Sequence, residues 1–208
     1  MKSTKKTLQM AMAIMGTTLI LWSCQKDNAP LVSGAFNGTI TASVADGARF
    51  NSSFTKVWAL VGAEETSSGG LEADELIAIG QYANGGFTIT LPSSLKEEHL
   101  MNIRDFFEDE MRVSGNLKYS NPEARIAGLD FVAVNDSNEW YGFFYSADGD
   151  AAQRTFCFII YADADVDVTG GPTVSFKRGW NRLYYSSPKS LVTTKEPNGI
   201  TWYFEDDL

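Results

Sequence analysis

The sequence predicts an all-β protein, either an antiparallel β-sandwich or a partly closed barrel, of about 8–10 strands with one short amphipathic helix. Three observations predict this class. Apolar and polar residues alternate with a period of two along most of the chain, and clusters of Asn, Asp, Gly and Pro separate the runs at regular intervals. No regular alternation of strands with helices indicates a parallel sheet.

The first half of the chain contains the clearest strands. Predicted strands cover residues 40–44, 57–61, 75–82 and 87–91. Asn84-Gly85-Gly86 predicts a tight hairpin turn between the last two, because Asn and Gly tolerate the positive φ that such turns need. Pro92 then ends the strand.

One helix is predicted after Pro92. Ser94 followed by Glu97 fits a capping box at its start. Four apolar residues fall on one face at helical spacing, namely Leu100, Ile103, Phe107 and Met111. We expect this helix to cover an open end or an edge of a sheet.

The second half returns to strands. Residues 126–134 and 139–146 predict a second hairpin, residues 155–168 the longest strand, and residues 174–177, 182–186 and 200–204 three short closing strands, with 191–194 a further candidate. Along residues 155–168 the even positions are all apolar, whereas the odd positions end in three aspartates. One face of this strand is therefore expected to be buried throughout, and the other to pass from buried to solvated.

The first 23 residues are a predicted signal peptide. Three lysines precede an apolar run, Leu8 to Leu21, which is too short and too interrupted for a membrane span of roughly 20 residues. The run ends in Leu21-Trp22-Ser23-Cys24, which resembles the lipobox of bacterial lipoproteins. That resemblance implies cleavage before Cys24 and acylation of its thiol, and it favours a lipoprotein over an ordinary secretory leader with an incidental cysteine.

The mature chain is acidic. The leader contains three of the 17 Lys and Arg and none of the 26 Asp and Glu, which leaves a net charge of −12. Such a chain is not expected to bind nucleic acid, which requires a clustered basic surface. A polar stretch with Pro and Gly predicts a tether over residues 24–34, and residues 35–208 are expected to form a single β-sandwich domain. The acylated Cys24 is the expected contact with the lipid bilayer.

The C-terminal segment carries a further resemblance. Lys177-Arg178-Gly179-Trp180-Asn181 resembles a Lys-Gly-Trp-Asn strand-turn of many small Bacteroidota lipoproteins, and Trp202-Tyr203-Phe204 is similar to their ending. Together with the leader, these motifs imply an outer-membrane lipoprotein of a group that is often surface-displayed. Most members of that group have no characterised function, so the resemblance implies a location and no activity.

Catalytic signals are missing from the sequence, and the chain is not predicted to be an enzyme. His99 is the only histidine, so every histidine-dependent scheme must use it, and we interpret it as a solvated residue of the predicted helix. Cys157 lies in the apolar run Phe156–Ile160 and is interpreted as an inert core thiol. With Cys24 acylated, no intramolecular disulfide can form.

Calcium is the one cofactor for which the sequence offers candidate ligands. Asp163, Asp165 and Asp167 are candidate ligands, because on a strand they share one face about 7 Å apart. Val168 and Val174 stand where an EF-hand requires Gly and Glu. A solvated acidic face explains the same aspartates without a ligand, so no metal site is predicted.

The aromatic residues are the best lead to a ligand site. The candidates are Trp140, Tyr141, Trp180, Tyr184 and Trp202. On the outer face of a sandwich such rings hold sugars or partner proteins, whereas on the inner face they pack in the core.

Three functions stay open. The first and preferred one is a non-catalytic binding or adhesion module that captures a glycan or another envelope protein, which an exposed row of the tryptophans would favour. The second is a structural or accessory subunit of an envelope complex, favoured by a flat apolar patch with an unpaired edge strand. The third is a hydrolase that uses carboxylates from separate strands, favoured by a deep cleft holding two acids with raised pKa.

Overall fold

The computed structural model describes residues 34–113, 115–148, 154–171, 173–186 and 191–205. The predicted signal peptide, Cys24 and the tether as far as residue 33 lie outside these residues. Over the described ranges, no helix is long and apolar enough to cross a membrane.

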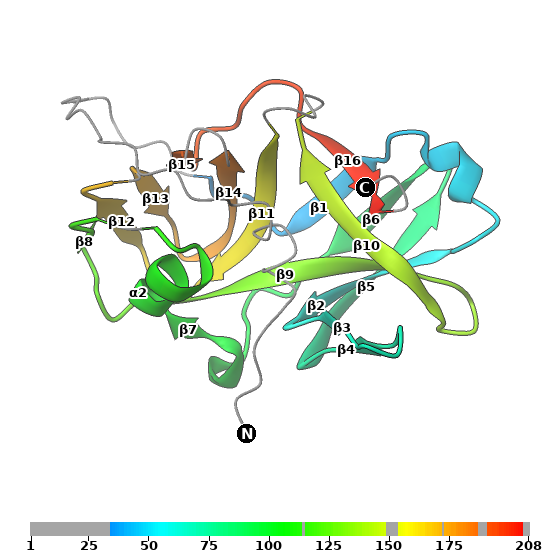
Figure 1. Ribbon diagram of the computed structural model, residues 1–208, viewed down its shortest axis with the longest axis horizontal. Coiled ribbons are helices and arrows are strands. Elements are labelled where there is room, and N and C mark those ends of the chain that lie inside the picture. Colours follow the sequence, from blue (N-terminus) through cyan, green and yellow to red (C-terminus); the bar gives the residue numbers. More distant parts are fainter. Residues whose placement is uncertain (1–33, 114, 149–153, 172, 187–190, 206–208) are drawn as a thin grey trace.

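An antiparallel sheet of 11 strands dominates the fold and curls into a half-barrel (Figure 1). Its main path runs β1 (Thr39–Ser43), β6 (Gly86–Thr90), β5 (Glu75–Ala83), β2 (Lys56–Val61), β9 (Arg125–Val134), β10 (Trp140–Ala147), β11 (Thr155–Ala162), β14 (Gly179–Ser186) and β15 (Leu191–Thr193). Off this path, β16 (Thr201–Phe204) pairs with β10, and β7 (Met101–Asn102) pairs with β9. The predicted class is confirmed in its partly closed form.

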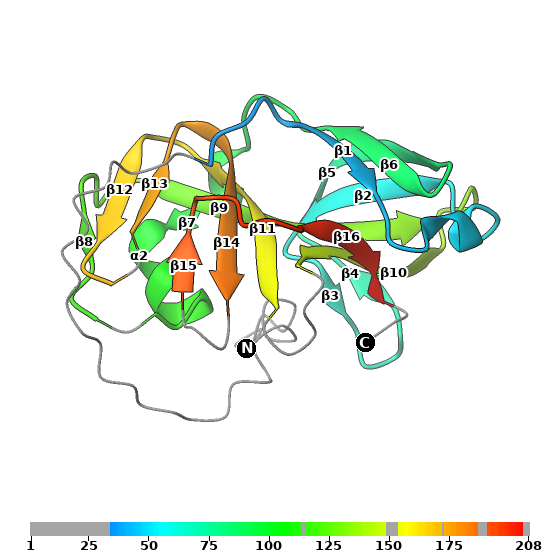
Figure 2. The same cartoon turned by 90° about the horizontal axis from the view of Figure 1, so that it is seen from above.

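Two smaller sheets and a few helical turns complete the described chain. One small sheet consists of β13 (Val174–Phe176), β12 (Val166–Thr169) and β8 (Lys118–Tyr119), and the other of β3 (Glu64–Glu65) and β4 (Leu71–Glu72). The helical segments are η1 (Gly47–Phe50), η2 (Glu97–His99), α2 (Ile103–Asp105) and its continuation η3 (Phe106–Glu110). Figure 2 shows β8, β12, β13 and α2 gathered on one side of the molecule, with β1, β2, β5 and β6 on the other.

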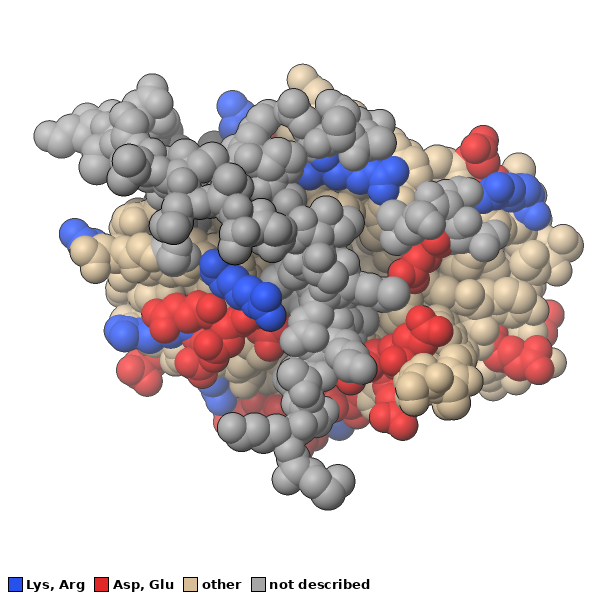
Figure 3. Space-filling model, in the orientation of Figure 1, with Lys and Arg blue, Asp and Glu red and all other residues tan. Residues whose placement is uncertain are grey.

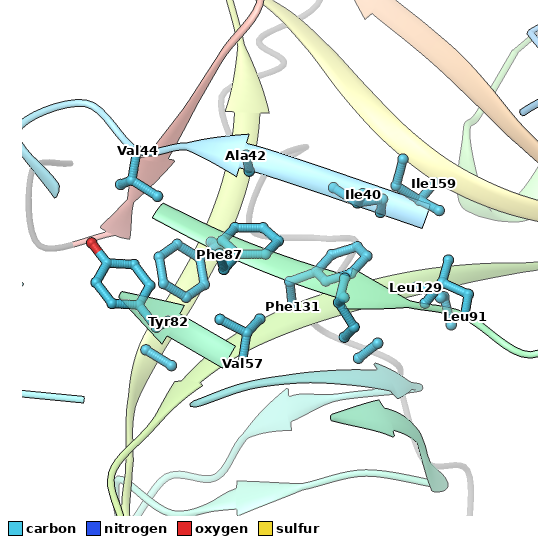
Figure 4. Close-up of a cluster of buried hydrophobic side chains, with 14 of the residues drawn as sticks. Ile40, Ala42, Val44, Val57, Tyr82, Phe87, Leu91, Leu129, Phe131 and Ile159 are labelled. Carbon is cyan, nitrogen blue, oxygen red and sulfur yellow. The ribbon is translucent and has the colours of Figure 1, made fainter. Parts of the chain in front are cut away.

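Each side of the molecule has its own hydrophobic cluster. The first cluster fills the half-barrel, where side chains of β1 and β6 project towards Phe131 of β9 (Figure 4). The second lies between the large sheet, the small three-stranded sheet and the helix. Strand β11 serves both, with Ile159 in the first cluster and Ile160 in the second, because successive side chains of a strand point to opposite faces.

Both predicted hairpins are present. Asn84 and Gly85 have φ of 55° and 78° and connect β5 to β6, as expected for a two-residue turn with positive φ at both positions. Strands β9 and β10 form the second hairpin.

The predicted helix begins later than expected. Residues 101–102 pair with Arg125 and Ile126 as strand β7, so the capping box from Ser94 to Glu97 is wrong. The actual N-cap is Asn102, whose Oδ1 accepts a 2.9 Å hydrogen bond from the backbone N–H of Arg104.

The long strand predicted over residues 155–168 is interrupted at 163–165, where the chain leaves the large sheet for the small one. Aspartate side chains hold this bend. Asp163 accepts hydrogen bonds from the backbone N–H (2.8 Å) and Nε (3.0 Å) of Arg125. Asp165 accepts from the backbone N–H of Arg178 and from Nζ of Lys177, both at 2.8 Å. The sequence did not predict this bend because apolar and polar residues alternate on both sides of it. Polar side chains can accept the hydrogen bonds of a bent backbone in place of a strand partner.

Candidate functional site

The five candidate aromatic residues do not form one surface platform. Trp180 and Tyr184 are buried, with 4% and 1% of their surfaces exposed, and Trp180 packs in the first cluster. The indole N–H of Trp180 donates to the carbonyl of Pro92 at 2.6 Å, and its ring packs edge-to-face on Tyr161. Of the two alternatives open for the candidate Trp180, the structure therefore shows packing in the core.

Trp140 and Tyr141 lie near the start of β10. Tyr141 is 49% exposed, whereas Trp140 is half-buried against Phe143 and donates its indole N–H to the carbonyl of Gly69 at 3.3 Å. Trp202 is half-buried against the first cluster. Among the five candidates, only Tyr141 is largely exposed, so Trp140, Trp180 and Trp202 do not form an exposed row.

The aspartate and histidine candidates are engaged in structural contacts. Asp163 and Asp165 are bound by cationic side chains at the bend, and no group of three or more His, Cys, Asp or Glu in the described part of the chain is arranged to hold a metal ion. His99 was expected to be solvated, but its side chain is only 9% exposed and contacts the carboxylate of Glu75. This correction follows from the late helix start, which places His99 in the compact turn η2.

A cavity of about 290 Å³ lies at the open seam of the half-barrel and brings two of the aromatic candidates together. It is bounded by β1 on one side and by β11, β14 and β16 on the other. We call it the seam pocket; its functional lining comprises Ser146, Cys157, Arg182, Tyr184, Glu196 and Trp202.

The seam is bordered by the edge of β1 that lies opposite to β6. Hydrogen bonds at Gly38 and Val44 fix the register, so the even residues of β1 bond to β6. In an antiparallel pair the bonding residues alternate, and the peptide groups of Thr41 and Ser43 are therefore directed away from β6, towards the seam. Over the described residues, no strand pairs with β1 on this edge, and only single bridges at Ala35 and Val44 span the seam.

The lining of the seam pocket combines a ring with polar groups of balanced charge. The Trp202 ring is held edge-to-face by Phe87 and Phe131, at centroid distances of 5.0 and 5.4 Å. The Arg182 guanidinium lies over the Phe36 ring, 4.6 Å from its centroid, and Glu196 supplies the opposite charge. This pocket therefore suits a polar ligand without net charge.

Burial keeps the remaining titratable groups of the seam pocket neutral. It raises the pKa of the Cys157 thiol to about 12 and also raises the pKa of Tyr184, which hydrogen-bonds to that thiol. Both side chains therefore offer hydrogen bonds rather than nucleophiles or charges. This agrees with the interpretation of Cys157 as an unreactive thiol, although it lines a cavity and is only half-buried.

Sequence reasoning missed Arg182, Glu196 and Ser146, because nothing in a linear pattern shows that β1 leaves its edge open opposite them. No family model matches the chain, and neither a curated protein nor a solved structure does.

Proposed function

We propose that this chain is a lipid-anchored protein of the bacterial outer membrane whose β-domain captures a glycan in the seam pocket without catalysing a reaction. The observation that carries the proposal is the grouping of Trp202 and Tyr184 with Arg182 and Glu196 around one cavity. A sugar has an apolar C–H face and a ring of hydroxyl groups, and this lining complements both. The volume of about 290 Å³ suits a single sugar unit.

The anchoring part of the proposal is supported by the lipobox at Cys24 and by the charge of the mature chain. Because the mature chain contains 14 basic and 26 acidic residues, the domain has little electrostatic attraction to an anionic bilayer. Two or three acyl chains on Cys24 would supply stable attachment, since each buried CH₂ contributes about 0.8 kcal/mol.

Glycan capture is tested by titrating the full-length protein in detergent with a panel of neutral monosaccharides and short glycans, using calorimetry. The informative variant is Glu196→Gln, because Glu196 is exposed and its replacement leaves the core intact. We expect Glu196→Gln to weaken binding roughly tenfold, since a hydrogen bond to a charged group contributes about 1.5 kcal/mol.

The matched control is Glu123→Gln, an exposed glutamate outside the seam pocket, which should bind as the unmodified protein does. If no neutral glycan binds, or if Glu196→Gln and Glu123→Gln bind equally well, the seam pocket is not a sugar site.

Anchoring is tested separately in cells. Cys24→Ala should abolish labelling with radioactive palmitate and move the protein out of the membrane fraction. Cys157→Ser, the matched change at the other cysteine, should leave both unchanged. Palmitate labelling that persists in Cys24→Ala contradicts the lipid anchor without affecting the glycan proposal.

A second candidate, an accessory subunit of an envelope complex, is favoured by the edge of β5. Strand β6 pairs with β5 only over Gln81–Ala83, and the preceding part of β5 exposes Leu76 (41%) and Ile79 (55%). Exposed apolar side chains on a free edge are typical of a protein contact. Photo-crosslinking from position 79 in cells would yield a defined adduct under this candidate and none under glycan capture alone.

A further inference from the structure

Strand β9 changes partners along one of its edges and leaves a gap there. On this edge β2 pairs with Asp130–Val134 and β7 pairs with Arg125 and Ile126. The opposite edge is occupied by β10 and then by β11. Within the described residues, no strand pairs with 127–129 on the gapped edge, and a cavity of about 170 Å³ lies there. We call it the Asp130 cleft.

Asp130 is an unusual residue for its position. It lies in β9 between Leu129 and Phe131, both buried, and is itself half-buried where it lines the cleft. The backbone N–H of Ala63 hydrogen-bonds to the carboxylate, but burial outweighs that bond and raises the pKa to about 7. A carboxylate has room for about four hydrogen bonds. Among the residues that line the cleft there is no Lys or Arg, so an ionised Asp130 has no strong cation beside it there.

The walls of the Asp130 cleft are apolar and its rim is acidic. Apolar contact is offered by Val61, Leu100, Met101, Phe106, Phe158 and Ile160. The other titratable groups that line it are Glu64, Asp74, Glu98, His99 and Glu110, from four separate segments. His99 contacts Glu75, whereas Lys96 lies outside the lining and forms a 3.8 Å ion pair with Glu98. The face of the molecule in Figure 3 likewise shows acidic side chains gathered along its lower part.

We propose that the Asp130 cleft binds a small organic cation, a primary amine with an apolar body, whose ammonium group pairs with the Asp130 carboxylate. The apolar body then contacts Phe106 and Phe158. The acidic rim attracts the cation and repels anions, as clefts lined by one sign of charge do. This site is separate from the seam pocket and does not depend on glycan capture.

The floor of the cleft offers a way to test the proposal without changing a charge. Gly128 lines the cleft, and a Cβ added there would meet only Cδ1 of Ile160, at 3.8 Å. That is an ordinary contact, and Gly128 has no positive φ that would exclude a side chain. Gly128→Ala should therefore fold normally while it places a methyl group in the space of the ligand.

The experiment titrates 2-phenylethylamine into the full-length protein at about pH 8, where Asp130 is ionised, by calorimetry or ligand-observed NMR. 3-Phenylpropanol and 3-phenylpropionate serve as neutral and anionic probes of similar shape. We expect saturable binding of the amine, and binding of the other two that is weaker by roughly tenfold or more. Asp130→Asn and Gly128→Ala should each weaken amine binding by a similar factor, and Glu196→Gln should not change it.

The proposal is overturned if the amine does not bind, if the three probes bind alike, or if Asp130→Asn binds the amine as tightly as the unmodified protein does. Should Asp130→Asn fail to fold, Gly128→Ala decides the question, because undiminished binding in that variant places the amine elsewhere. Displacement of the amine by millimolar calcium would also overturn it, because the cleft would then be a metal site.

Discussion

Replacing Asp130 with asparagine should make the protein more stable at alkaline pH and remove part of its pH dependence. The pKa of Asp130 rises from 3.8 to about 7 on folding. Between these values the folded state binds the proton more strongly than the unfolded chain does, so the free energy of unfolding falls as the pH rises from about 4 to about 7. Asparagine has no proton to lose, and its Oδ1 can keep the hydrogen bond from Ala63.

The magnitude follows from the pKa change. A tenfold change in an ionisation constant corresponds to about 1.4 kcal/mol. If Asp130 were fully enclosed, its ionisation would therefore lower the free energy of unfolding by about 4 kcal/mol. Because part of the residue is open to the cleft, water screens the charge, and we expect about half of this, about 2 kcal/mol.

Urea unfolding of both proteins at several pH values between about 4 and 8 checks this prediction. The stability of Asp130→Asn relative to the unmodified protein should increase by about 2 kcal/mol across that range. Asp109→Asn, a change on the exposed surface of η3, controls for the loss of one negative charge. A stability difference that stays constant with pH would refute the reasoning, because it would mean that Asp130 titrates alike in the folded and unfolded states.

Three further changes test the fold and the seam pocket. Asn181→Ala should cost about 2–3 kcal/mol in urea unfolding, because the buried Asn181 donates to two carbonyls of the turn and accepts from the N–H of Lys177; an unchanged midpoint would contradict this. Phe107→Ala should cost about 3–5 kcal/mol, since Phe107 is fully buried in the second cluster, whereas Glu108→Ala on the exposed side should change little; equal losses would show that the helix packs otherwise. Cys157 should react with iodoacetamide about a thousandfold more slowly in the folded than in the denatured protein at about pH 8, because its pKa of about 12 leaves almost no thiolate. The measurement uses Cys24→Ala, so that Cys157 is the one cysteine present. Rapid labelling of this variant in its folded state would contradict the prediction.

Much of the sheet could be predicted from local patterns. The turn at Asn84 and Gly85 depends on two adjacent residues that adopt positive φ, so its location and its tightness are written in the sequence. The bend at Asp163 was missed because its stability comes from Arg125 and Lys177, which are distant in the chain. The helix start was missed for a similar reason. Residues 101–102 pair with β9 and are held in a strand conformation, although the apolar spacing there is helical.

The candidate sites were predictable only in part. Trp202 and Tyr184 attracted attention as aromatic residues, but the period of two could not show that both line a cavity. Nor could it show that Trp180, on the same strand as Tyr184, lies in the core. Asp130 carried a signal that a linear search could have used. It is the one acid within the otherwise apolar run from Ile126 to Val134, and a charge in such a strand requires either a partner or a function.

The two cavities share a wall, which affects how each can be tested. Cys157 and Ile159 of β11 line the seam pocket, whereas Phe158 and Ile160 line the Asp130 cleft. Successive residues of a strand point to opposite faces. The apolar run of β11 is typical of a strand buried in a core, but in this protein it separates two cavities that differ in charge. A substitution in β11 would therefore disturb both cavities together. Glu196 and Gly128 each line only one of them and lie outside this strand, so their replacement separates capture of a neutral sugar from capture of a cation.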